Sequence, residues 1–233
     1  MASLALLICV ALSCGAAQGA DATAMQALSV DQIVQRLVER NSQRSELLQH
    51  YSCKRHYHLD YHGFPSSKEA SMDVNVTFNA PAAKTFTVTS ESGSKMLADR
   101  VFRRLMESEK EAASAPARTA LTRENYSFEL LGTDSEPDGL AYVLKVTPRG
   151  ESRFLYSGKI WVDGKDFAVT RIDAEPAKNP SFWIKKTDIH HRYMKVGEFW
   201  LPRQNQTETH TRLGGVADLT IDYSDYQVAP RPD

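Results

Sequence analysis

The chain has 233 residues, of which 42% are hydrophobic and 24% are charged, and its formal net charge is −1. This composition is that of a globular protein with a sizeable core, and one large β domain can account for the length. A net charge so close to zero provides no overall field for nucleic acid or an anionic membrane, so we expect no nucleic-acid partner.

The N-terminal residues have the pattern of an export signal. Leu4–Leu12 is an apolar run too short to cross a bilayer, and the small residues of Ala17-Gln18-Gly19 fit a cleavage site. We therefore expect a signal peptide over residues 1–19, a flexible leader over 20–28 and no transmembrane segment. A buried N-terminal segment is the alternative, because the first three residues carry no Lys or Arg.

The cysteines bear on disulfides and on a lipid anchor. Cleavage would leave Cys53 as the sole cysteine, so no disulfide within the chain is expected. Cys14 is a poor site for a lipid anchor because the residue three positions before it is not Leu. The mature protein is therefore expected to carry no anchor and to rely on its core for stability.

A helix is expected directly after the leader. Ser29 and Gln32 have the spacing of a capping box, and Leu28 and Ile33 have that of a hydrophobic staple. Ile33 and Leu37 share an apolar face with their neighbours, which indicates an amphipathic helix that docks on an apolar surface.

Strand patterns dominate from residue 51 onward, with side chains alternating between apolar and polar. The expected strands are 51–61, 72–78, 84–89, 126–132, 140–147, 153–162, 167–174, 182–196, 199–211 and 216–228. Asp163-Gly164 and Gly214-Gly215 are among the turns that supply the positive φ of tight hairpins. A single domain over residues 29–229 and a short tail over 230–233 follow from this pattern.

A second amphipathic helix is expected over residues 95–111, between the third and fourth strands. Leu97, Val101 and Leu105 form its apolar stripe, with Phe102 and Met106 at the sides. Residues 112–122, rich in Ala, Ser and Pro, are expected to form a loop.

The expected fold class is mainly β (α+β). About ten sequential antiparallel strands would form a curved, incompletely closed β-barrel, because strong twist disfavours a flat open sheet of that size. The two amphipathic helices would act as lid or plug. The pattern leaves open whether the interior is an apolar cavity or a filled core. The chain contains neither βαβ alternation nor a Gly-rich phosphate loop.

The segment from Tyr156 to Ala174 resembles the central signature of LolA-like outer-membrane lipoprotein-sorting proteins, the superfamily of the LolA, LolB and LppX type. In that family a strand that ends in an acidic turn, here Ile160-Trp161-Val162-Asp163, precedes a strand carrying Arg and Ile, here Arg171-Ile172. Phe199-Trp200-Leu201-Pro202 and Asp222-Tyr223-Ser224-Asp225-Tyr226 are similar to the family's last strands, and the order of elements from Val30 to Val228 also fits.

The resemblance implies an unclosed barrel with a helical lid, located in the periplasm. It also implies acyl chains of lipids or lipoproteins as ligands, with no cofactor, and in some members a membrane-bound protein partner in envelope-stress signalling. In the sorting chaperones an Arg on the sheet hydrogen-bonds the lid and gates ligand entry. Here Arg55 or Arg171 would take that part.

Apolar side chains on the inner face of the sheet and on the second helix are the candidates for lining a ligand cavity. They are Phe86, Phe102, Met106, Phe154, Tyr156, Ile160, Val162 and Trp183. Four of them, between residues 154 and 162, share a strand face without charge, and pockets are lined mainly by such groups. Ordinary core packing is the competing interpretation for most of them.

Histidines gather on the first strand. His56, His58 and His62 share one strand face with Asp60, and imidazoles two residues apart on a strand can chelate a divalent ion. The competing interpretation is a solvated outer face opposite an inner Tyr/Leu face, and we favour it, so no metal is expected.

Other charged residues indicate surface chemistry. Arg100, Arg103 and Arg104 are expected to form the wet face of the second helix, with a partner's acidic surface as the alternative. Glu107 and Glu109 are expected to be surface carboxylates. No nucleophile elbow of the G-x-S-x-G type is present, so we expect no enzyme.

Two functions from different classes follow. The first is an exported carrier or chaperone that holds acyl chains between a curved sheet and its helices. The alternative is a periplasmic interaction or sensor domain that binds a protein partner.

Overall fold

The structure is a computed structural model that describes residues 28–136, 139–179 and 181–230. The expected signal peptide, Cys14, nearly all of the expected leader and the last three residues of the tail lie outside the described residues.

Ten antiparallel strands form one sheet. They are β1 (Leu48–His62), β2 (Lys68–Asn79), β3 (Ala83–Gly93), β4 (Tyr126–Glu136), β5 (Gly139–Pro148), β6 (Tyr156–Asp163), β7 (Val169–Pro176), β8 (Ile184–Val196), β9 (Phe199–Thr211) and β10 (Val216–Pro230). Their spatial order is β3-β2-β1-β10-β9-β8-β7-β6-β5-β4, so the first and last strands are neighbours and β3 and β4 are the two edges. The expected fold class, a curved sheet of ten strands that does not close, is confirmed.

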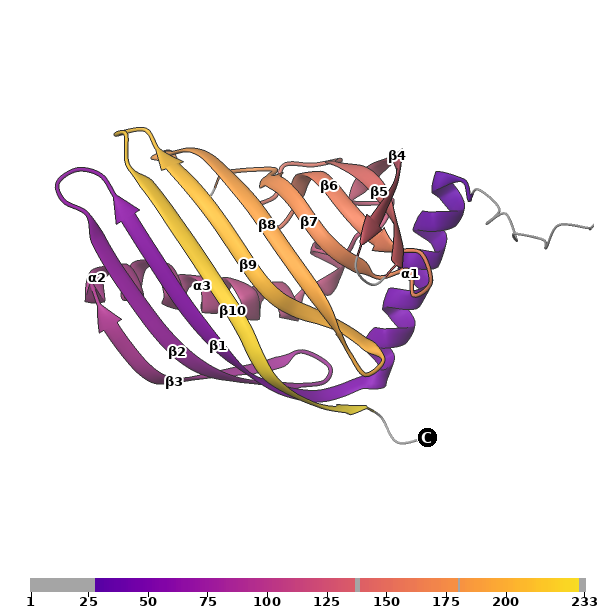
Figure 1. The fold of residues 1–233 in the computed structure, drawn as a ribbon, viewed down its shortest axis with the longest axis horizontal. Helices are drawn as coiled ribbons and strands as arrows, with labels where there is room; N and C mark the ends of the chain where they lie inside the picture. Colours follow the sequence, from indigo (N-terminus) through magenta and orange to yellow (C-terminus); the bar gives the residue numbers. More distant parts are fainter. Residues whose placement is uncertain (1–27, 137–138, 180, 231–233) are drawn as a thin grey trace, which may run out of the picture.

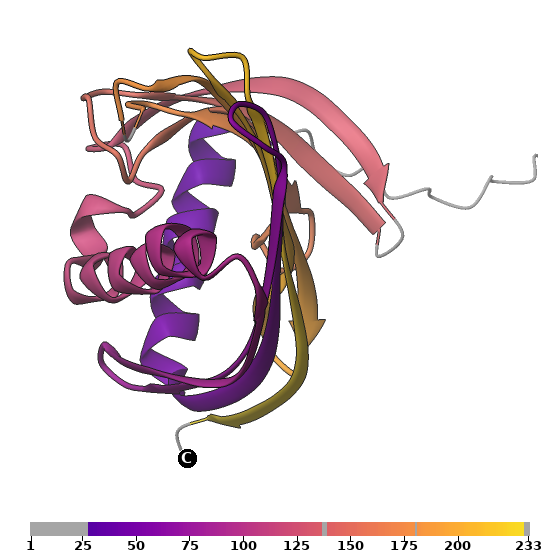
Figure 2. The same ribbon diagram turned by 90° about the vertical axis from the view of Figure 1, so that its left-hand side faces the viewer.

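Two helical elements lie on the concave face of this sheet (Figure 2). Helix α1 (Val30–Leu47) begins with the expected capping box: the Ser29 amide donates to Gln32 Oε1 at 2.9 Å, and the Gln32 amide donates to Ser29 Oγ at 3.3 Å. Its buried residues are Ile33, Val34 and Leu37. None of the helices in the described part of the chain combines the length and apolarity needed to cross a bilayer.

The second helical element contains a π-helical turn. It consists of α2 (Lys95–Leu97), the π segment η1 (Ala98–Phe102) and α3 (Arg103–Ser114), followed by a short 3₁₀ turn, η2 (Pro116–Arg118). The expected stripe was wrong in its phase. Ala98, Phe102 and Met106 are buried, whereas Leu105 is 37% exposed. The buried row therefore lies one residue later than Leu97, Val101 and Leu105 along the whole helical element.

Each helical element covers its own half of the sheet (Figure 1). Helix α1 packs with residues of β4–β7, including Tyr126, Leu144 and Ile160. The η1–α3 element packs with residues of β1, β2 and β10, including Tyr57 and Met72. The two cores are therefore separate, and the surface between the two helices is where a cavity can form.

We expect Phe102→Ala to lower the free energy of unfolding by about 3–5 kcal/mol, since Phe102 is fully buried and its removal leaves a void. Leu105→Ala, one turn along the same helix, serves as the matched control and should change it by less than about 1 kcal/mol. Urea unfolding followed by circular dichroism measures both. Equal losses would contradict the shifted phase of this helix.

Candidate functional site

A cavity of about 600 Å³ lies on the concave face of the sheet. The end of α1, the end of α3 and the segments 119–121 and 153–156 contribute to its wall, and β7, β8 and β9 complete it. Its lining residues are Asn41, Arg44, Ala112, Thr119, Leu121, Arg153, Phe154, Leu155, Tyr156, Ala168, Val169, Ile172, Pro176, Ile189, His191, Tyr193 and Trp200. Most of these side chains are aliphatic or aromatic.

The histidine and the tyrosines that line the cavity are neutral near pH 7. Burial lowers the pKa of His191 to about 4, and the adjacent His190 adds to this effect. Burial raises the pKa of Tyr193 to about 12, and it raises the pKa of Tyr156 as well. The two lining arginines are engaged by other groups, Arg44 by backbone carbonyl oxygens and Arg153 by Glu111.

Two arginines, Arg118 and Arg153, lie at the rim of the cavity. Two guanidinium groups contact the Phe154 ring, with the Arg118 Cζ atom 5.1 Å and the Arg153 Cζ atom 4.8 Å from its centroid. Arg153 also pairs with Glu111 of α3. Strand β6 begins at Tyr156 rather than at the expected residue 153. Residues 153–155 therefore lie outside the sheet and form part of the cavity wall.

Asp166, in the turn after β6, connects the elements around Trp200 in the cavity wall. Its carboxylate accepts hydrogen bonds from Trp200 Nε1 at 2.9 Å and pairs with Lys195 at 2.6 Å. Arg44 of α1 donates to the carbonyl oxygens of Asp166 and Phe167 at 2.8 and 3.0 Å. These bonds hold the end of α1, the turn and β9 together around the aromatic ring of Trp200.

A buried ionic cluster beside the cavity ties α3 to the sheet. Arg55, at the middle of β1 and only 3% exposed, makes two hydrogen bonds with Glu109 of α3, at 2.6 and 2.9 Å. Lys84 of β3 reaches the same carboxylate at 2.7 Å. The Arg55 guanidinium also lies over the Tyr223 ring, 4.7 Å from its centroid. The expectation that Glu109 is a surface carboxylate was therefore wrong.

Electrostatics holds this cluster in its charged form. Burial alone would raise the pKa of Glu109, but the hydrogen bonds and charges of Arg55 and Lys84 outweigh it and lower that pKa to about 2. Burial alone would lower the pKa of Arg55 and of Lys84, and the pairing with Glu109 raises both. Both cations and the carboxylate are ionised near neutral pH.

The structure divides the eight expected cavity residues among four environments. Phe154 and Tyr156 line the cavity. Ile160 and Val162 are fully buried in the core under α1, and Phe102 and Met106 lie in the core under α3. Phe86 is partly buried against that second core, and Trp183 is 60% exposed before β8. The inner face expected for Ile160 and Val162 is the face that packs on α1.

Sequence reasoning missed much of the cavity wall on β8 and β9, above all Ile189, His191, Tyr193 and Trp200. Alternation along β8 does place residues 189, 191 and 193 on one face. It does not say which face is concave, and register shifts occur at Arg192/Tyr193 in β8–β9 and at Trp161/Val162 in β6–β7.

The two expected gating arginines lie on opposite faces of the sheet. Arg55 faces the helices and contacts α3 through Glu109. Arg171 lies on the convex face, where it pairs with Asp173 and stacks on Trp161, 4.1 Å from the ring centroid. Of the two arginines, Arg55 therefore contacts a helix on the concave face and Arg171 does not.

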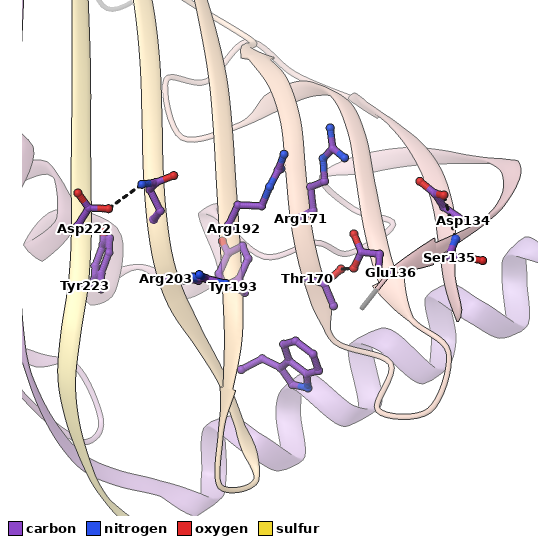
Figure 3. A pocket seen from close by; sticks show the side chains of 12 residues that line it. Asp134, Ser135, Glu136, Thr170, Arg171, Arg192, Tyr193, Arg203, Asp222 and Tyr223 are labelled. Atoms are coloured by element: carbon purple, nitrogen blue, oxygen red, sulfur yellow. Dashed lines mark hydrogen bonds between the residues drawn. The ribbon is translucent and has the colours of Figure 1, made fainter. Parts of the chain in front are cut away.

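A second, polar cavity of about 630 Å³ lies on the convex face beside β4 and β5 (Figure 3), and we call it the convex groove. Arg171, Arg192 and Arg203 project into it from three strands. The hairpin is held over it by two hydrogen bonds, from Thr170 Oγ1 to Glu136 at 2.7 Å and from Trp161 Nε1 to Asp134 at 3.1 Å. Tyr193 and Trp200 line both this groove and the concave cavity.

The histidines of β1 face outward, and each has its own partner. His56 Nδ1 lies 2.7 Å from Asp73, His58 Nδ1 lies 2.9 Å from Ser71 Oγ, and His62 Nδ1 lies 3.4 Å from Ser67 Oγ. The ligand atoms that approach His58 within 4.8 Å belong to Asp60 and Glu69 rather than to the other two imidazoles.

The arginines of the second helix have different surroundings. Arg103 pairs with Asp99 and with Glu91 of β3, both at 2.8 Å, while Arg100 and Arg104 are exposed. This arrangement agrees with the wet helix face expected from the sequence.

The fold and the site together define a class of protein: a curved, open sheet with helices on its concave face and an apolar cavity between them. This is the LolA-like arrangement that the sequence resemblance implied. A family described as a family of unknown function (DUF5686) matches residues 108–226, which is 119 of the 233 residues and so just over half of the chain. The chain belongs to this family. Among curated proteins, none matches the sequence.

Several solved structures are similar in fold. A DUF1329 family protein from Desulfovibrio piger is 14% identical with a TM-score of 0.43, covering 85% of this chain and 92% of its own. A domain from Vibrio parahaemolyticus described as an outer membrane lipoprotein-sorting protein is 14% identical with a TM-score of 0.43, covering 84% and 91%. A LolA superfamily protein from Nitrosomonas europaea is 13% identical with a TM-score of 0.34, covering 88% and 96%. At these values, none of the likenesses bears on what this chain binds.

We expect Glu109→Gln to lower the free energy of unfolding at pH 7 by about 3–5 kcal/mol, because it leaves the Arg55 guanidinium buried without a countercharge. The folded-state pKa of Glu109, about 2, lies below its ordinary value of 4.5. Its stabilisation is therefore complete above pH 5 or so and fades as the pH falls toward 2. Guanidinium-chloride unfolding across this pH range measures the difference.

Glu107→Gln, an exposed neighbour on the same helix, is the matched control and should have almost no effect at any pH. A difference between wild type and Glu109→Gln that stays constant from pH 7 to pH 3 would contradict the assigned role of the carboxylate.

Proposed function

We propose that the protein is a non-catalytic carrier that holds an acyl chain of a lipid or lipoprotein in the concave cavity. The observation that carries this proposal is the cavity itself, with its mostly apolar wall, its neutral histidine and tyrosines and the arginines at its rim. Export to the periplasm is part of the same proposal, since an acyl chain released from a membrane needs cover while it crosses an aqueous compartment.

Size and chemistry favour an apolar chain as the ligand. The volume of about 600 Å³ falls within the range of roughly 300–1,000 Å³ that is usual for small-ligand pockets. Apolar surface contributes about 25 cal/mol for each Å² removed from water, so a chain can bind here without charged contacts in the interior. The arginines at the rim suit an anionic headgroup or carboxylate left at the mouth.

In this proposal the ionic cluster around Arg55 controls whether α3 moves away from the sheet and opens the cavity. Helix α3 contributes the Ala112 end of the cavity wall and is tied to the sheet through Glu109. Displacement of α3 would separate the carboxylate from both cations, so the closed form is favoured until a ligand or partner offsets that loss. Arg55 is therefore proposed as the gating arginine.

Cys53, the one cysteine among the described residues, gives little support to a catalytic role. Burial raises the pKa of the Cys53 thiol, which disfavours the reactive thiolate. Cys53 also belongs to the core under α3 rather than to the cavity.

Binding of a protein partner on the convex groove is the second candidate function. The groove is lined by three arginines and by Asp134, Glu136 and Asp222, so it suits a partner segment that carries both charges. Arg203→Glu should abolish capture of such a partner and leave fatty-acid binding unchanged, which separates the two candidates.

We expect Val169→Trp to fill part of the cavity and to weaken binding of a dansyl-labelled undecanoic acid by tenfold or more, as measured by fluorescence titration with palmitate as competitor. Val88→Trp, on the edge strand β3 and 37% exposed, is the matched control and should bind as the wild type does. Thermal unfolding of both variants checks that each is folded.

Two results would count against the carrier function. One is a wild-type protein that does not take up the probe. The other is uptake that Val169→Trp leaves unchanged while palmitate still competes, since the ligand would then lie elsewhere.

A further inference from the structure

The four most exposed large apolar side chains of the described residues lie at one end of the sheet. They are Phe64 (80% exposed), Phe182 (74%), Leu213 (70%) and Trp183 (60%). Phe64 is in the β1–β2 turn, Phe182 and Trp183 are in the β7–β8 connection, and Leu213 is in the β9–β10 turn. Single exposed apolar residues are ordinary, but a set that gathers on neighbouring turns indicates a binding surface.

Contacts between the turns make this end one continuous edge (Figure 1). The Arg212 amide donates to the Trp183 carbonyl oxygen at 2.9 Å, and Arg212 Nε donates to the Phe182 carbonyl oxygen at 2.7 Å. The β1–β2 turn abuts the β9–β10 turn so closely that a Cβ atom at Gly63 would lie 2.7 Å from the Gly215 Cα atom. We call this surface, made by the turns and adjoining strand ends over residues 62–68, 177–179, 181–186 and 211–216, the turn edge.

Basic residues dominate the turn edge. Its segments contain Lys68, Lys178, Lys185, Lys186 and Arg212 and no acidic residue. Lys186 pairs with Asp188 at 2.8 Å and with Glu175 at 3.5 Å, and Glu69 directly follows Lys68, so Lys178, Lys185 and Arg212 supply most of the positive charge of this surface. Arg212 also stacks on Phe182, 4.8 Å from the ring centroid, and Phe182 contacts Trp183 edge-on at 5.8 Å. Aromatic and aliphatic side chains among basic ones are typical of surfaces that bind anionic membranes.

An acidic row crosses the convex face directly behind this edge. Five carboxylates lie opposite one another on adjacent strands, in the order Glu69, Asp60, Asp218, Glu208 and Asp188. Like charges in direct opposition repel one another and an anionic surface alike. The acidic row therefore limits how closely an anionic membrane can approach. The tips of the turns can enter the headgroup region of such a membrane, whereas the convex face of the sheet is repelled from it.

We propose that the turn edge docks the protein on an anionic lipid bilayer. Phe64, Trp183 and Leu213 enter the interface between headgroups and acyl chains, and the basic side chains contact the lipid phosphates. The positive charge is local to the turns, so the net charge of −1 for the whole chain does not oppose such contact. This docking is independent of what the concave cavity holds.

The test is flotation of the full chain with vesicles of phosphatidylglycerol and phosphatidylethanolamine, compared with vesicles of phosphatidylcholine alone. The wild type is expected to float with the anionic vesicles and at least tenfold less well with the neutral ones. The variant Phe64→Ser/Trp183→Ser/Leu213→Ser should lose at least tenfold in binding to the anionic vesicles. Its changes are at exposed positions, so its unfolding temperature should be preserved.

The matched control is Leu47→Ser/Leu131→Ser, which removes two exposed apolar side chains away from the turn edge and should float as the wild type does. Brominated lipids add a readout of depth: they should quench Trp183 emission, and Trp183→Phe should remove the quenched component. The N-terminal residues 1–27 are the same in every variant, so they cannot account for a difference between them.

Equal flotation of the triple variant and the wild type would overturn the proposal, as would a wild type that does not float at all. A dimer of the wild type in sedimentation, lost in the triple variant and without vesicle binding, would also overturn it and assign the turn edge to self-association.

Discussion

A buried guanidinium at the middle of the sheet fixes where the second helix lies. Arg55 is almost fully enclosed, and such a charge is stable only when a countercharge and hydrogen bonds replace the lost water. Glu109 provides both, with Lys84 as a third member of the cluster. Because Glu109 is on α3, the helix must cross the concave face at this place.

This constraint divides the interior into three parts. The core under α3 occupies one half of the sheet, and the core under α1 occupies the other. The concave surface of β8 and β9 lies between these two cores, and the cavity forms there, with residues of β7 at the border of the α1 core as part of its wall. An open interior is thus a consequence of two helices docked on separate halves of one curved sheet. A sheet of this size, curved but unclosed, leaves room for such a gap.

The fold was largely predictable because its signals are local. Period-two alternation and turns such as Asp163-Gly164 identified all ten strands, and the Ser29–Gln32 box identified the start of α1. The phase of the second helix was not predictable in the same way, since two adjacent rows are apolar: Leu97, Val101 and Leu105, and Ala98, Phe102 and Met106. Trp183 was expected inside, but β8 begins one residue after it.

The site was predictable only in part, because it depends on long-range geometry. Phe154 and Tyr156 were found from an uncharged strand face, whereas Tyr193 and Trp200 were missed. Which face of β8 and β9 is concave depends on sheet curvature and on a register shift next to Tyr193. The pairing of Arg55 with Glu109 joins residues 54 positions apart, and no local pattern marks it.

The central claim is that the concave cavity, and no other surface, holds an apolar chain. Photo-crosslinking with a diazirine-bearing palmitic acid, followed by peptide mapping, tests it most directly. The account predicts labels on residues 153–156, 189 and 191, all of which contribute to the wall of this cavity and not to that of the convex groove. Labels confined to the convex groove or to the turn edge would contradict it.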